Sequence, residues 1–180
     1  GKPKARAKDR EYSGEFPTSA RFDIPRNRKR AIAKIEAMDA STEYWRKCRG
    51  MSDEEWFERH LKIVDKDGNL VPLILNPAQV ILCREIRRQL KETGCVKLII
   101  LKARQLGMSA VVQGLQFRLI LESPNQSAIV MAHETEAADL VFERTRTFRD
   151  STRPMYPFKY SSRQEIVFEE PWRSCIRVKV

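Results

Sequence analysis

The sequence predicts an α/β fold with a mainly parallel central sheet, and two observations indicate this. The continuous apolar run at residues 96–101 has the composition of a strand buried on both faces, as strands of parallel sheets are. A helical stretch at residues 109–121 and a second apolar strand at residues 127–132 follow it. Together they make a strand–loop–helix–strand unit, and 180 residues with 42% hydrophobic content can bury the core of one such domain.

Three regions are expected along the chain. Residues 1–26 contain many Lys and Arg with little apolar periodicity, which predicts a flexible basic arm. This arm either binds DNA phosphates without reading sequence or remains a solvated tail. Residues 27–75 are expected to form a helical N-terminal segment and a β-hairpin, and residues 76–180 to form the front part of the α/β domain.

Local signals place the first helices. Apolar residues recur at helical spacing from Asn27 to about Cys48, which predicts one or two helices there. Ser52, followed three residues later by Glu55, has the pattern of a capping box. A short helix is therefore expected to start at Asp53.

Turn and cap residues place most of the remaining elements. Asp67-Gly68 lies between two apolar runs within residues 61–75, which indicates a β-hairpin. Asn76-Pro77 resembles a helix cap followed by proline at the first helical position, and Gly94 is expected to end that helix. A further helix and two further strands are expected at residues 135–148, 165–168 and 175–180.

Composition limits the class of protein. The net charge of +10 favours polyanionic partners such as nucleic acid or nucleotide. The four cysteines show no CxxC pair, so neither a zinc site nor a disulfide framework is indicated. No apolar run approaches the roughly 18 residues that a membrane helix requires, and the basic N-terminus lacks a signal-peptide core. A soluble, intracellular protein without membrane partners is expected.

The stretch from Lys102 to Ser109 lies between the apolar run and a helix, where backbone N–H groups and the helix dipole can form an anion site. Against the pattern G-x-x-x-x-G-K-[ST], Gly107 and Ser109 match, while Met108 occupies the usual lysine position and Lys102 the first glycine. A lysine at the front of the loop can supply the same charge to the phosphates. The alternative is an ordinary strand-to-helix turn.

This arrangement resembles the ATPase domain of the large terminase subunits of tailed bacteriophages. The resemblance covers residues 56 to 180 and includes the hairpin at residues 61–72, the segment Leu75-Asn76-Pro77-Ala78-Gln79, the loop, and the strand and helix beyond it. It implies a three-layer P-loop NTPase fold of the RecA/ASCE type, incomplete in this chain.

The resemblance also implies roles for single residues. Gln79 would read adenine, and the less favoured alternative is a surface glutamine on a helix. Arg104 would be catalytic by approaching the γ-phosphate, but it can also contact a carboxylate or help to bind nucleotide. Ser109 would ligate Mg²⁺. ATP would be held by the whole loop, Lys102, Ala103, Arg104, Gln105, Leu106, Gly107, Met108 and Ser109.

At the level of function, the resemblance implies a full-length ATPase that drives double-stranded DNA into a procapsid and cuts it with a separate nuclease domain. Its partners would be the small terminase subunit and the portal protein, in a homo-oligomeric ring in the host cytoplasm. The acidic catalytic segment lies beyond Val180 in this family, so the chain is expected to be inactive alone. A helicase-type motor, which Met108 argues against, and a non-hydrolysing DNA-binding or assembly protein are the alternatives.

Other polar residues are assigned ordinary roles. His60 is expected to pack beside its aromatic neighbours, and His133 to be a loop or capping residue. Arg144, Arg146 and Arg149 could meet DNA phosphates or a neighbouring subunit, but a solvated helix face is the favoured interpretation.

Overall fold

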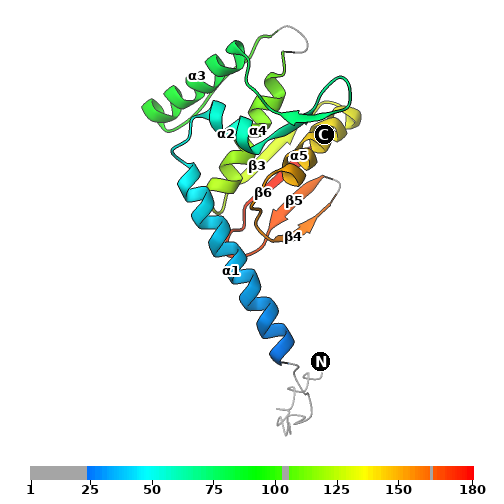
Figure 1. Ribbon diagram of the computed structural model, residues 1–180. Coiled ribbons are helices and arrows are strands. Elements are labelled where there is room, and N and C mark those ends of the chain that lie inside the picture. Colours follow the sequence, from blue (N-terminus) through cyan, green and yellow to red (C-terminus); the bar gives the residue numbers. More distant parts are fainter. Residues whose placement is uncertain (1–23, 103–105, 163) are drawn as a thin grey trace, which may run out of the picture.

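The computed structural model describes residues 24–102, 106–162 and 164–180, and it shows an α/β arrangement (Figure 1). One sheet has four strands in the order β3-β6-β5-β4, and a separate antiparallel pair is formed by β1 and β2. Within the larger sheet only β3 and β6 are parallel, whereas β6, β5 and β4 are antiparallel neighbours. The prediction of a mainly parallel sheet is therefore wrong for the described strands, because the hairpin of β4 and β5 adds two antiparallel pairings.

The N-terminal region is a single long helix, α1 (Ile24–Cys48). It begins three residues before Asn27, so the last residues of the predicted basic arm are helical, while residues 1–23 lie outside the described part. The C-terminal half of α1 packs into the body of the protein through Met38 and Trp45, and the N-terminal half extends away from it (Figure 1).

The local cap signals are confirmed. Helix α2 (Asp53–His60) follows Ser52, whose hydroxyl accepts the N–H of Glu55 at 3.1 Å. Strands β1 (Lys62–Val64) and β2 (Leu70–Pro72) form the predicted hairpin. Helix α3 (Pro77–Thr93) starts at the predicted proline and ends at Gly94 in the left-handed conformation.

The later elements also follow the sequence signals, with one addition. Helix α4 (Met108–Glu122), strand β3 (Ser127–Met131) and helix α5 (Thr135–Ser151) occur in the predicted order. Strands β5 (Glu165–Phe168) and β6 (Cys175–Lys179) are confirmed, and the turn between them contains Pro171-Trp172. Strand β4 (Phe158–Ser161) was not predicted; all four of its residues are exposed, so its sequence has no buried apolar pattern.

The predicted strand at residues 96–101 is absent. These residues pair with no strand in the described structure, and the side chains of Ile99 and Leu101 are 92% and 94% exposed. A strand buried on both faces needs neighbours at its edges and layers on both sides. Strand β3 pairs with β6 along one edge, and a cavity separates its other edge from Ile100. The apolar composition of residues 96–101 indicated a buried strand, but it could not specify the neighbouring strand with which such a strand must pair.

His60 packs inside an aromatic cluster, as expected. Its ring centroid lies 4.9 Å from that of Trp45 and 5.0 Å from that of Trp56, and the side chain is buried. Burial lowers the pKa of His60 to about 4, and the positive charges of Arg59 and Arg118 act in the same direction. The imidazole is therefore neutral in the fold at neutral pH.

This burial predicts a loss of stability in mild acid. The folded-state pKa lies below the unfolded value of about 6.5, so the stabilisation is complete above that value and is lost as the pH falls toward 4. Between pH 7 and pH 5 the loss should be on the order of 1 to 2 kcal/mol. Urea unfolding of the wild type and of His60→Phe at both pH values measures it. The variant should lose this part of the pH dependence, and an unchanged slope would refute the assignment.

Candidate functional site

The start of α4 is open to a ligand. Gly107 precedes the helix in the left-handed conformation, with φ of +67°, and no side chain of the described residues caps the helix start. The carbonyl of Gly107 accepts the N–H groups of Ala110 and Val111. The N–H groups of Met108 and Ser109 precede these bonded donors at the positive end of the helix dipole. Such donors are suited to binding an anion.

Gln79 holds the loop from behind. Its side-chain oxygen accepts the N–H of Asn76 at 2.9 Å, and its side-chain nitrogen donates to the carbonyl of Leu106 at 3.1 Å. The side chain is buried, so both ends of the amide are used inside the protein. In this structure Gln79 therefore ties the loop to the start of α3, and its predicted contact with adenine stays a prediction.

The position of Gln79 also explains the glycine. A Cβ atom on residue 107 would lie 2.6 Å from the side-chain nitrogen of Gln79, which is too close for any real contact. The positive φ angle disfavours other residues independently. The positive φ angle therefore favours glycine at position 107, and a larger residue would also force the side chain of Gln79 to move.

A cavity of about 500 Å³ lies beside the start of α4 and brings predicted residues together. Lys102 and Ser109 both line it and are both exposed. Buried Gln113 and the end of β3 at Ala132 and His133 form other parts of its wall. Among the described residues that line this cavity, none is Asp or Glu. Its charge therefore suits an anionic ligand.

The structure gives less support for a ligand contact by the other residues singled out in the sequence. Ala103, Arg104 and Gln105 lie outside the described residues. The side chain of Met108 is buried in the hydrophobic core at the edge of this cavity, so a role in binding would fall to its backbone N–H group. His133 is exposed, and its Nε2 lies 3.6 Å from Oε1 of Glu134, as expected for a loop residue.

The described residues offer few ligands for a metal ion. The exposed hydroxyl of Ser109 can serve as one ligand of Mg²⁺. However, in residues 24–102, 106–162 and 164–180 no three His, Cys, Asp or Glu side chains are grouped to hold a metal. Magnesium at this site would therefore have to share its coordination with phosphate oxygens.

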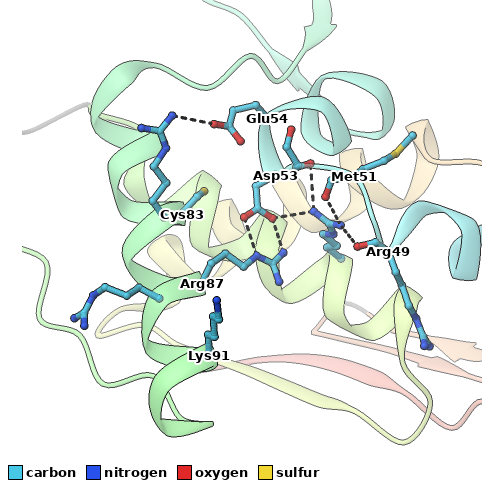
Figure 2. Close-up of a pocket in the computed structure, with 11 residues that line it drawn as sticks. Arg49, Met51, Asp53, Glu54, Cys83, Arg87 and Lys91 are labelled. Carbon is cyan, nitrogen blue, oxygen red and sulfur yellow. Dashed lines mark hydrogen bonds and ion pairs between the residues drawn. The ribbon is translucent and has the colours of Figure 1, made fainter.

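Sequence reasoning missed a second polar centre, shown in Figure 2. The buried carboxylate of Asp53 accepts from Arg87 at 2.9 and 2.5 Å and from Arg118 at 2.9 Å. Arg118 also donates to the carbonyl of Met51 and to the carboxylate of Glu122. A cavity of about 640 Å³ borders this cluster. Arg87 and Arg118 are both paired with Asp53, so neither is free to bind a ligand. The cluster instead joins α2, α3 and α4.

The only sequence signal for this cluster was the capping box, which places Asp53 at a helix start. The separation of Asp53 from its partners, 34 and 65 residues along the chain, left the pairing undetectable from local patterns. The hydrogen bond to Asp53 raises the pKa of Arg87. Burial raises the pKa of Glu122, and Arg118 opposes that effect.

No protein-family model matches the chain, and none of the curated proteins has a significantly similar sequence. No helix in the described part of the chain is long and apolar enough to cross a membrane. Function is therefore inferred from the geometry of the site and from the motif resemblance.

The contact between Gly107 and Gln79 predicts a measurable coupling. Gly107→Ala should destabilise the fold by roughly 2 kcal/mol, from the strained φ angle and from the clash with Gln79. Gly68→Ala, at a positive φ in open space, is the matched control and should show the conformational part alone. Urea unfolding of Gly107→Ala with and without Gln79→Ala isolates the clash. Additive effects in that double-mutant cycle would contradict the close approach.

Proposed function

We propose that this chain is the ATP-binding portion of a DNA-packaging motor of the large terminase type, with Mg-ATP held at the start of α4. One observation carries the proposal. Lys102 and Ser109, separated in sequence by the loop, line the same cavity at the open N-terminus of α4. A cation, a hydroxyl and the first N–H groups of a helix are the features that bind a triphosphate and its magnesium.

The charges around the loop support a phosphate ligand. A triphosphate is strongly negative, and the wall of the cavity supplies Lys102 with no acidic residue among its described members. The helix dipole adds a partial positive charge at the same point. Lys102 thus takes the part that the lysine next to Ser or Thr has in the common motif, where this chain has Met108. Arg104, inside the loop, is proposed to approach the γ-phosphate.

The wider role is proposed from the resemblance. In the full-length protein, a RecA/ASCE-type P-loop domain would hydrolyse ATP to move double-stranded DNA into a procapsid, and a separate nuclease domain would cut it. The small terminase subunit, the portal protein and further copies in a ring would be its partners in the host cytoplasm. The net charge of +10 supports a polyanionic partner such as DNA.

A second candidate is a non-hydrolysing assembly protein in which the loop is structural. Two observations favour it: the amide of Gln79 is used internally, and residues 96–101 do not form the strand expected before the loop. The exposed side chains of Ile99 and Leu101 would then belong to a contact with another protein. Under this candidate, nucleotide would not stabilise the fold.

Thermal unfolding with and without Mg-ATP separates the two candidates. Binding at 100 times the dissociation constant should stabilise the wild type by about 2.7 kcal/mol. Lys102→Ala should weaken binding at least about tenfold, because one charge-assisted contact is lost, while its melting temperature without ligand stays unchanged. Lys97→Ala is the matched control, an exposed lysine of the same extended segment that does not line the cavity. No stabilisation of the wild type, or equal binding by Lys102→Ala, would refute the proposal.

A further inference from the structure

Arg144 of α5 lines a second cavity that borders the start of α4. This cavity has a volume of about 410 Å³, and Gly107 and Ala110 form its wall on the side of the loop. Strand β1 contributes Ile63 and Val64, and α5 contributes Arg144 and three of its neighbours, Leu140, Glu143 and Thr147. The guanidinium therefore shares a cavity with the glycine that opens the proposed phosphate site.

Arg144 is half-buried, and no carboxylate of the described residues pairs with it. Within the described residues, its polar contact is a hydrogen bond from Nη1 to the side-chain oxygen of Gln113, at 3.1 Å. Glu143 lines the same cavity, but no ion pair joins it to Arg144 among the described residues. Burial lowers the pKa of Arg144, and no acidic neighbour opposes that effect. Arg118 differs in this respect: it is more deeply buried, but it is paired with the carboxylates of Asp53 and Glu122.

This arrangement is electrostatically incomplete. Removing an arginine from water is unfavourable unless an opposite charge compensates it. Here the cation instead borders the positive end of α4, where the dipole adds to the unfavourable energy. Gln113, itself buried, offers a neutral oxygen that can orient the guanidinium but cannot neutralise it. A bound anion would offset both the cost of burying the guanidinium and its repulsion from the positive end of α4.

We propose that Arg144 binds the phosphate chain of the nucleotide, as a second cation beside Lys102. This assignment rests on the proposed function and extends it to a residue outside the loop. Guanidinium groups bind phosphate oxygens through paired, charge-assisted hydrogen bonds, for which Arg144 keeps its remaining N–H groups. Gln113 connects the two cavities, because it lines the one that contains Lys102 and accepts a hydrogen bond from Arg144.

The test is the thermal stability of Arg144→Met with and without two probes, Mg-ATP and sodium tripolyphosphate. Methionine keeps much of the aliphatic side chain but removes the charge. The variant should bind both probes at least about tenfold more weakly than the wild type. Without a probe it should melt at the same temperature or higher, because an uncompensated cation has been removed. Arg144→Lys, which keeps the charge, should recover part of the affinity.

Arg146→Met is the matched control. Arg146 lies two residues further along α5, with its guanidinium over the ring of Phe142 at 5.0 Å, and it does not line the cavity of Arg144. It should bind both probes as the wild type does. If the wild type binds and Arg144→Met binds equally well, the role of Arg144 is refuted while the nucleotide site stands. Lower stability of Arg144→Met without a probe would show a structural role instead. If the wild type binds neither probe, both proposals fail.

Discussion

The buried ion pair between Asp53 and Arg118 is the interaction on which the placement of the site depends. Arg118 has a side chain only 3% exposed, and Asp53 accepts from it and from Arg87 at the same time. A buried charge pair is stable only when both partners are present, so it resists any relative shift of the helices that carry them. Helices α2, α3 and α4 therefore meet in one arrangement (Figure 2), and the direction of α4 is set by it.

The N-terminal end of α4 is held by a different contact, and together the two contacts fix the position of the site. Gln79 at the start of α3 binds the carbonyl of Leu106, so the loop cannot move away from the helix that it precedes. With both ends fixed, the open N-terminus of α4 stays beside Lys102 on one cavity and Arg144 on another. Three positive features thus lie around the start of α4, on two neighbouring cavities, and no described carboxylate is paired with Lys102 or Arg144. This charge distribution favours an anion over a purely structural turn.

Local chemistry made much of the fold predictable. Ser52, Asn76, Pro77 and Gly94 act through backbone groups within a few residues, so the sequence alone places the helices that they begin or end. The exposed run at residues 96–101 shows the limit of such reasoning. Its apolar composition is plain, but burial depends on a neighbouring strand that local sequence does not specify.

The candidate site was predictable to a similar extent. The motif pattern singled out Lys102 and Ser109, and both line one cavity in the structure, whereas their role in binding nucleotide stays a prediction. The inward orientation of Gln79 and the unpaired charge of Arg144 could not be predicted, because each depends on contacts between segments far apart in sequence. The Asp53 cluster was missed for the same reason.

Binding of a triphosphate to the first N–H groups of α4 can be followed in heteronuclear NMR spectra of the chain during a titration with Mg-ATP. The amide resonances of Gly107, Met108 and Ser109 are expected to shift first and most, since their N–H groups would contact phosphate. Saturable shifts confined to other parts of the chain, with these three resonances unmoved, would contradict it.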